Sequence, residues 1–354
     1  MTRPLLTVCI PAYNRAADLA PLLRSILSQD FDDWNCVIAE DNSRERDAIR
    51  GVVEEFSREH PGRFRYHENV QTLGYDGNFR RLVELADGHY VFVMGNDDLV
   101  YPGAFRAVAR GVQLRPDVGV ILRAYAFFRG SPDNVYQITR YYAEQRTFEP
   151  GLPALVACYR RLVAISGLVL HRDSAHAVAT SRWDGTLFYQ HWLAANILCE
   201  RSAVYVPDIL ALFRKDGVPE FGNAAAERGL YTPGLQPPST DVRMLRSLVA
   251  IAEDAGQRTG IRFVEHFKSD YAHYMYPTLA HQAHEPWPVF WRFYRDLGAI
   301  GFDRYVSFHA WFWLIVVAGA SRVERIIQFI RRRVGHTPNL TRGVRSTSTL
   351  PRTH

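Results

Sequence analysis

The sequence predicts an α/β protein, in which a mostly parallel (mixed) sheet is flanked by helices and a helical C-terminal region follows. Two observations support this. Short β-branched apolar runs alternate with segments whose apolar residues have helical spacing, up to about residue 122. From residue 239 to residue 335 the patterns are helical only. Strands that alternate with helices are typical of a parallel sheet covered on both faces.

The expected strands are apolar runs that end at a proline or at polar residues. They cover residues 5–10, 35–39, 64–67, 90–94 and 118–122. The expected helices between them cover residues 16–27, 49–56, 79–86 and 103–114. The middle of the chain is less regular, and we expect a strand at 162–170, a helix at 187–198 and a strand at 204–208.

We expect four parts along the chain. Residues 1–216 form the first domain, and residues 217–238 are a Pro/Gly-rich linker or loop. Residues 239–335 form the helical region, with helices at about 240–255 and 261–279. The tail at 336–354 is rich in Thr, Ser, Arg and Pro, a composition typical of disorder.

The composition predicts a folded protein with anionic ligands. It is 47% hydrophobic and 22% charged, which is enough for a real core. The net charge of +5 suits nucleotide phosphates or acidic lipid headgroups. The N-terminal half lacks the dense basic stripe of a nucleic-acid-binding protein. The four cysteines form no CxxC pair, and we expect buried thiols in a reducing cytosol.

Polar clusters follow three of the expected strands. They are Pro11-Ala12-Tyr13-Asn14, Glu40-Asp41-Asn42-Ser43 and Asn96-Asp97-Asp98. Ligands of such sheets bind beyond the carboxyl ends of the strands, so we expect the three clusters to converge on one crevice. This convergence is the strongest physical indication of a site.

The acidic run Asn96-Asp97-Asp98 suits a hard metal ion. Carboxylates bind Mg²⁺ or Mn²⁺, and such an ion neutralises charge on a diphosphate leaving group. Asp is also common in turns and at helix N-caps, so the run alone does not distinguish a metal site from a structural turn. No Gly-rich phosphate loop and no GxGxxG follows the first strand, which argues against a kinase-like or dinucleotide-binding site.

Five motifs in order resemble a family 2 glycosyltransferase over roughly the first 120 residues. They are Val8-Cys9-Ile10-Pro11-Ala12-Tyr13-Asn14, Glu40-Asp41-Asn42-Ser43, Gly74-Tyr75-Asp76-Gly77-Asn78, Ala86-Asp87-Gly88-His89-Tyr90-Val91 and Gly95-Asn96-Asp97-Asp98. The resemblance implies the glycosyltransferase A-type fold, also called nucleotide-diphospho-sugar transferase-like. It also implies inverting transfer from a nucleotide-diphospho-sugar. Residues 1–216 would then be the catalytic domain.

The resemblance also implies roles for the residues before the acidic run. Pro11, Tyr13 and Asn14 would line the nucleotide pocket. Asp41 would accept a hydrogen bond from the base, and Asn78 would help to hold the nucleotide or the sugar. Packing of Tyr13 on the first helix and an N-cap role for Asn14 are the structural alternatives.

Within the acidic run, the resemblance implies that Asp97 contacts ribose or the donor sugar and that Asp98 ligates Mn²⁺ or Mg²⁺. Asn96 stands where the family usually has its first acid, which lowers the charge of this donor-binding loop. Arg214, in Phe213-Arg214-Lys215, resembles a family element that faces the diphosphate as a fixed cation.

Inverting transfer needs a base for the acceptor hydroxyl. The family's Glu-Asp pair is missing from the corresponding stretch, Tyr189-Gln190-His191-Trp192, and His191 is our expected base. An imidazole with a pKa near 6.5 accepts a proton at neutral pH. Asp184 is the competing candidate, and a helix-face histidine without a catalytic role is the structural alternative.

Residues 305–321 contain no Asp, Glu, Lys or Arg, and their centre is strongly apolar. A bilayer crossing takes about 17–25 apolar residues, so the segment is at the lower limit. Apolar residues interleaved with arginines follow it, a pattern typical of a helix that lies in the membrane surface. We expect peripheral attachment to the cytoplasmic membrane face; a buried helix is the alternative.

Membrane attachment suggests a saccharide or lipid-linked acceptor, as in surface polysaccharide biosynthesis, by analogy alone. Two other functions fit the same motifs. One is a non-catalytic protein that binds a sugar nucleotide or acts as a scaffold. The other is a nucleotidyltransferase that uses the acidic loop for another phosphate reaction.

Overall fold

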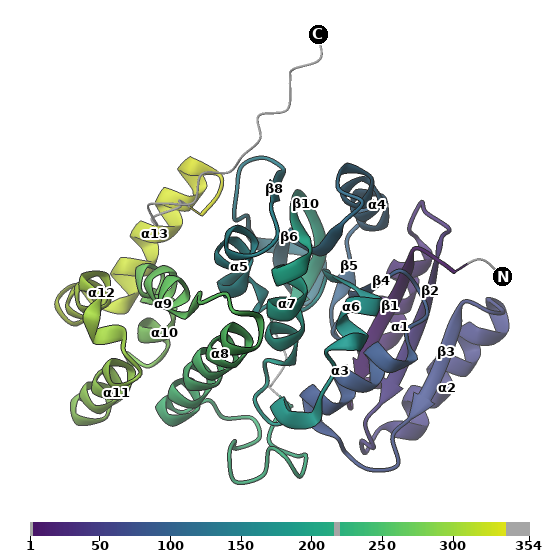
Figure 1. Cartoon of the computed structure of the whole chain (residues 1–354). Coiled ribbons are helices and arrows are strands. Elements are labelled where there is room, and N and C mark those ends of the chain that lie inside the picture. The colour runs from purple at the N-terminus through teal and green to yellow at the C-terminus, as the bar shows by residue number, and fades with distance from the viewer. Residues whose placement is uncertain (1–2, 216–219, 338–354) are drawn as a thin grey trace.

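A computed structural model of the chain describes residues 3–215 and 220–337. The N-terminal half of its sheet consists of four parallel strands, in the order β3-β2-β1-β4. They are β1 (Leu6–Ala12), β2 (Trp34–Glu40), β3 (Phe64–Glu68) and β4 (Tyr90–Val93). They lie at the end of the molecule opposite the C-terminal helices (Figure 1).

The other half of the sheet is mixed. β9 (Leu168–His171) runs antiparallel between β4 and β6 (Val118–Arg129), and β10 (Ser202–Arg214) is parallel to β6. Three more strands complete the sheet: β5 (Leu99–Val100) pairs with β10, β7 (Ser131–Thr139) with β6, and β8 (Arg146–Phe148) with β10. The predicted mixed α/β sheet is therefore confirmed.

Two apolar cores cover the two faces of the sheet. The first packs α1 (Ala16–Leu27), α2 (Arg46–Glu59) and α4 (Ala104–Leu114) on one face. The second core contains the remaining helices of the first 215 residues. They are α3 (Gly74–Leu85), α5 (Leu152–Cys158), α6 (Arg172–Ala177), α7 (Tyr189–Glu200) and the 3₁₀ turns Tyr159–Leu162 and Ser181–Trp183.

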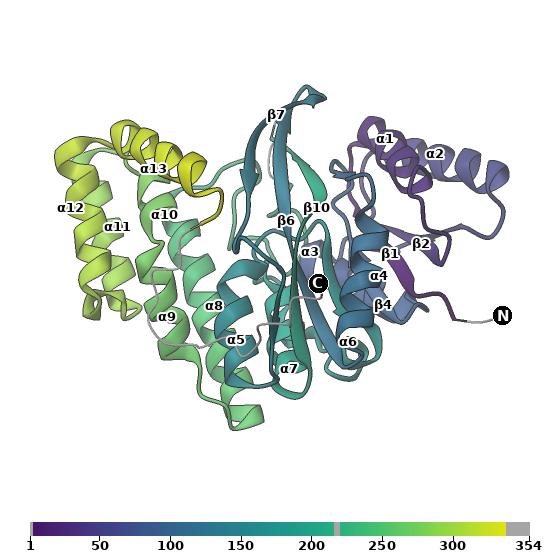
Figure 2. The same ribbon diagram turned by 90° about the horizontal axis from the view of Figure 1, so that it is seen from above.

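The C-terminal region is a helical array that shares the second core. It consists of α8 (Pro238–Thr259), α9 (Val264–His273), α10 (Tyr276–His281), α11 (Trp287–Ala299), the turn Phe302–Arg304, α12 (Val306–Ala318) and α13 (Ala320–Val334). Figure 2 shows these helices on one side of the sheet. Within the described residues, no single helix is long and apolar enough to cross a membrane. Only α12 and α13 together meet that criterion, and they are bent by 116°.

Two expected elements differ from the structure. Only the end of the expected strand 162–170 is a strand, because a turn precedes it. Gly167 has φ 81°, and the buried Arg123 guanidinium donates to the carbonyls of Ala164 (2.7 Å) and Ser166 (2.7 Å from Nη2). The expected helix 261–279 is two helices, α9 and α10. The tail after residue 337 lies outside the described residues.

Candidate active site

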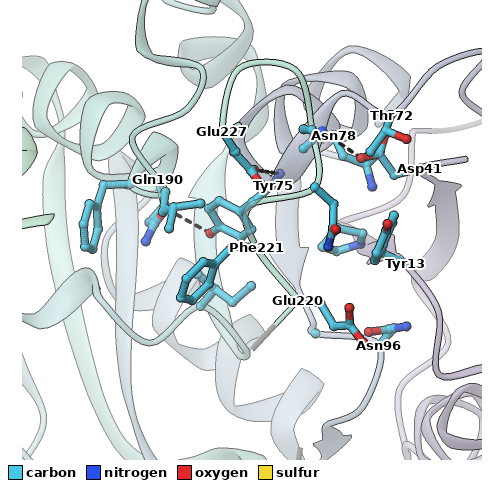
Figure 3. Close-up of a pocket in the computed structure, with 18 of the residues that line it drawn as sticks. Tyr13, Asp41, Thr72, Tyr75, Asn78, Asn96, Gln190, Glu220, Phe221 and Glu227 are labelled. Carbon is cyan, nitrogen blue, oxygen red and sulfur yellow. Dashed lines mark hydrogen bonds between the residues drawn. The ribbon is translucent and has the colours of Figure 1, made fainter. Parts of the chain in front are cut away.

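A cavity of about 470 Å³ opens beyond the carboxyl ends of β1, β2 and β4. Its volume lies in the range of small-molecule sites. The three polar clusters expected to converge each contribute to it. Six residues singled out in the sequence line the cavity: Pro11, Tyr13, Asp41, Asn78, Asn96 and Asp97. Figure 3 shows Tyr13, Asp41 and Asn78 at one end of the cavity and Gln190 at the other, with Tyr75 between them.

Asp41 is held rigidly at the first end. Its carboxylate accepts hydrogen bonds from the backbone N–H groups of Leu73 and Gly74, both at 2.8 Å, and from Asn69 Nδ2 at 2.9 Å. Burial raises the pKa of Asp41 to about 6, although these hydrogen bonds oppose the shift. Oδ2 accepts a single bond, from Gly74, and this oxygen has the capacity to accept another from a ligand.

Asn78 is part of the same framework. Its Nδ2 donates to the carbonyl of Ala39 (2.9 Å), and its Oδ1 accepts from Asn69 (2.9 Å). The amide therefore joins α3 to the end of β2 and shapes the wall of the cavity. Any hydrogen bond to a ligand would use the second N–H of Nδ2 or the second lone pair of Oδ1.

The acidic run is divided between the cavity and its wall. Asp97 lines the cavity and forms an ion pair with Arg15, which is not among the predicted site residues. Asp98 lies behind the lining. Its two carboxylate oxygens accept from Ser166 Oγ (2.5 Å) and from the backbone N–H of Arg214 (2.8 Å). Burial, and then the nearby Asp97, raise the pKa of Asp98 to about 7. The ligand role expected for Asp98 does not agree with this placement.

Asn14 and Arg214 also lie outside the lining. The Asn14 carbonyl accepts from Asn96 Nδ2 (2.9 Å), so it positions the acidic run. Asn14 has φ 53° and the next residue φ 59°, and this left-handed pair turns the chain from β1 into α1. Arg214 is paired with Asp18 (3.2 Å) and donates to the carbonyl of Asp97 (3.2 Å). It is near the acidic run without facing the cavity.

His191 is in the core rather than at the cavity. Its side chain is 0% exposed and is packed between the rings of Tyr159 (5.1 Å) and Phe188 (5.2 Å). Neither ring nitrogen makes a hydrogen bond of ordinary geometry, and burial lowers the pKa of His191 to about 3. The buried imidazole lies outside the cavity lining, so this placement does not support the expectation that His191 is the base.

Gln190, the residue before His191, is the one that faces the cavity. Gln190 lines it, and Gln190 Oε1 accepts from the hydroxyl of Tyr75 at 2.9 Å (Figure 3). Asp184, the competing candidate, is outside the lining and forms an ion pair with Arg80 at 2.8 Å. Sequence spacing cannot distinguish adjacent residues at a helix start, because one step changes the direction of a side chain by about 100°.

Residues between 220 and 236, before α8, line one side of the cavity. Glu227 is 2% exposed, and its carboxylate accepts from the backbone N–H groups of Tyr75 (2.9 Å) and Gly222 (2.7 Å). A Cβ at Gly74, where φ is +79°, would lie 2.4 Å from Glu227 Oε1. The sequence gives no signal for Glu227, since a lone acid in a Pro/Gly-rich stretch is ordinarily a solvated one.

The cavity offers few metal ligands. Over residues 3–215 and 220–337, no three His, Cys, Asp or Glu side chains are grouped to hold an ion. Mg²⁺ sites in phosphate-transfer enzymes use one or two carboxylates together with the phosphates of the substrate. Asp97 fits that pattern from the cavity side, whereas Asp98 is not among the residues that line the cavity.

Comparisons with known proteins indicate similarity to glycosyltransferases. Residues 7–162 match the model described as "Glycosyl transferase family 2". The abequosyltransferase RfbV of Salmonella typhimurium is 32% identical over 94 residues, which cover 27% of this chain and 28% of that protein. The GalNAc(5)-diNAcBac-PP-undecaprenol beta-1,3-glucosyltransferase of Campylobacter jejuni is 31% identical over 102 residues, or 28% and 32% of the two chains. The matches therefore span about a third of these relatives.

A solved structure confirms the fold. The mannosyltransferase PcManGT of Pyrobaculum calidifontis, in complex with GDP-Man and Mn²⁺, superimposes with a TM-score of 0.51 at 18% identity. The superposition covers 92% of this chain and 88% of that one. The predicted glycosyltransferase-like α/β fold is thus confirmed.

Proposed function

Because this chain contains a family 2 glycosyltransferase domain, we propose that it is an inverting glycosyltransferase. It would move a sugar from a nucleotide-diphospho-sugar to a hydroxyl of a saccharide or lipid-linked saccharide. The observation that carries the proposal is the convergence of Tyr13, Asp41, Asn78 and Asp97 on one cavity at the strand ends. Four separate sequence motifs supply these residues, and their meeting beyond the strand ends is what a nucleotide site of this topology requires.

In this proposal the nucleotide lies at the Asp41 end. Asp41 Oδ2 would accept a hydrogen bond from a base N–H, and Tyr13 would lie against the base or ribose. The diphosphate would lie along Asn96 and Asp97. Arg15, which pairs with Asp97, brings positive charge to this part of the cavity. A Mn²⁺ or Mg²⁺ ion held by Asp97 and the diphosphate would neutralise the charge on the leaving group.

The reaction is a single displacement. The acceptor oxygen forms a bond to the anomeric carbon while the bond from that carbon to the diphosphate oxygen breaks, and a base takes the hydroxyl proton. Glu220 is an exposed carboxylate in the cavity lining, and it accepts a long hydrogen bond, 3.4 Å, from Asn14 Nδ2. The other lining acids, Asp41, Asp97 and Glu227, are held by shorter contacts. We assign the base to Glu220.

Glu220→Gln tests this assignment with Asp184→Asn as the matched control. The first substitution should lower kcat by about 10²-fold or more with little change in donor affinity. The second should leave kcat within a few-fold. A normal kcat for Glu220→Gln, with a fall for Asp184→Asn, would transfer the role to Asp184.

A protein that binds the donor without transferring it is the second candidate function. The observation that favours it is the absence of carboxylates from Tyr189-Gln190-His191-Trp192 at the start of α7, where the family's Glu-Asp pair is expected. Donor binding without release of the nucleoside diphosphate, in the presence of a panel of saccharide acceptors, would support this candidate.

The surface of α11–α13 fits peripheral contact with a membrane. Trp287, Trp291 and Trp313 are 52%, 36% and 49% exposed. The ring centroid of Trp291 lies 5.7 Å from that of Trp287 and 6.4 Å from that of Trp313. α13 exposes Ile326, Phe329 and Ile330 beside several arginines, among them Arg332 and Arg333. Aromatic and apolar side chains beside cations are typical of helices at an anionic lipid surface.

We propose that this surface attaches the protein to the cytoplasmic face of the membrane, near a lipid-linked acceptor, as in surface polysaccharide biosynthesis. Co-sedimentation of the full chain with vesicles of anionic phospholipid tests this. The triple variant W287S/W291S/W313S should lose most binding. The control V135S/Y136S/I138S removes exposed apolar residues from β7 and should bind normally. Equal binding by both variants would contradict the attachment.

A further inference from the structure

The end of the cavity around Gln190 has mainly apolar walls. Its lining comes from three segments: the turn before β9, the residues just before α7, and the loop and helix after β10. The apolar members are Val163, Ile165, Leu187, Phe188, Phe221 and Met244. In Figure 3, Phe221 lies below Tyr75 and beside Gln190, at the end opposite Asp41.

Most polar side chains at this end already have partners within the protein. Gln190 Oε1 accepts from the Tyr75 hydroxyl, and Gln236 Nε2 donates to Asp241 at 2.6 Å. Both oxygens of Glu227 accept from backbone N–H groups. Asn223 adds one amide to the lining. A hexose at this end would therefore meet a few polar side chains, already partly engaged, among six apolar ones.

The orientation of the donor follows from the proposed function, on which this inference rests. A nucleotide-diphospho-sugar carries its base at one end and its sugar at the other. If the base is at Asp41 and the diphosphate is along Asp97, the sugar lies toward Gln190, against the apolar walls. A hydroxyl buried there without a partner weakens binding, whereas a methyl or methylene gains from the same contact.

We propose that this end of the cavity selects a deoxysugar, so that the donor is a nucleotide-diphospho-6-deoxyhexose or a related sugar that lacks a hydroxyl. Ile165, Phe188 and Met244 would determine the specificity by packing against the deoxygenated edge. The preference is set by the walls of the site and not by the nucleotide.

Matched donor pairs test the proposal by calorimetry on the full chain. GDP-mannose is compared with GDP-rhamnose, and UDP-glucose with UDP-6-deoxyglucose, so that each pair differs by one hydroxyl. Within the pair whose nucleotide binds, we expect the deoxysugar to bind about tenfold to hundredfold more tightly. Apolar pockets reject an added hydroxyl by roughly this amount.

Met244→Gln gives the reciprocal test, because it nearly conserves volume and adds an amide that can pair with a hydroxyl. It should reduce the preference severalfold while free GDP or UDP binds as in the wild type. The control Leu235→Gln, at a 60% exposed position outside the lining, should keep the full preference.

The outcomes separate this inference from the proposed function. Tighter or equal binding of the parent hexose, with normal nucleotide binding, would overturn the deoxysugar preference alone. Lack of binding by every nucleotide and every nucleotide sugar would overturn the proposed function and, with it, this inference.

Discussion

Replacement of His191 by phenylalanine should protect the fold against acid and leave catalysis intact. The His191 side chain is fully buried between two aromatic rings, and burial lowers its pKa from 6.5 to about 3. In the unfolded chain the imidazole is protonated as the pH falls below 6.5, while the folded protein keeps it neutral. The contribution of neutral His191 to the free energy of unfolding is therefore fully present well above pH 6.5, and it is lost as the pH falls toward the folded pKa.

The magnitude follows from this window. Between pH 7.5 and about pH 5, the unfolded state gains a proton at His191 that the folded state does not bind, which costs about 2 kcal/mol of unfolding free energy. Phenylalanine fills a similar space and has no group that titrates, so the variant should not lose this part of its unfolding free energy on acidification. Asp41, Asp76 and Asp98 have raised pKa values and change stability in the opposite direction. They are common to both proteins and cancel in the difference.

Urea unfolding of wild type and His191→Phe at the two pH values measures the effect. We expect the stability difference between the proteins to change by about 2 kcal/mol in favour of the variant at about pH 5. Sugar transfer at neutral pH should be within a few-fold of wild type. A pH-independent stability difference would refute the argument from the buried imidazole. A loss of turnover by 10²-fold or more in a folded variant would restore His191 as the base.

Three further outcomes are expected. Asp97→Asn should abolish any dependence of donor binding on Mn²⁺ while Asp98→Asn should retain it; loss of that dependence only in Asp98→Asn would assign the ligand to Asp98. Glu227→Gln should destabilise the fold by about 1–3 kcal/mol and weaken donor binding, because one buried N–H loses its carboxylate partner; an unchanged melting temperature would contradict this. Gly74→Ala should weaken donor binding, since its Cβ would lie 2.4 Å from Glu227 Oε1, and wild-type affinity would show that the loop adapts.

The N-terminal half of the fold was predictable because its strands are buried apolar runs with polar residues directly after them. β1 and β2 differ from the expected ranges by only one or two residues at each end. The polar residues at the strand ends also predicted which side chains meet in the cavity. Parallel strands bring their carboxyl ends to one edge of the sheet, so the convergence needs no knowledge of loop conformation.

The acceptor side was harder to predict, because tertiary contacts determine it. Arg123 fixes the turn before β9 through carbonyls that are distant in sequence, and an apolar run there resembles a strand. Glu227 reaches Tyr75 across 152 positions, which no local pattern encodes. His191 and Gln190 are adjacent in sequence, and only the orientation of α7 decides which one faces the cavity.

Calorimetric titration of the full chain with UDP-, GDP- and dTDP-sugars, with and without Mn²⁺, tests the central claim most directly. We expect at least one nucleotide sugar to bind with one-to-one stoichiometry. Tyr13→Ala, at the nucleotide end of the cavity, should weaken that binding without lowering the melting temperature. Binding that is unaffected by Tyr13→Ala, or no binding of any nucleotide sugar under either condition, would contradict the assignment of this cavity as a donor site.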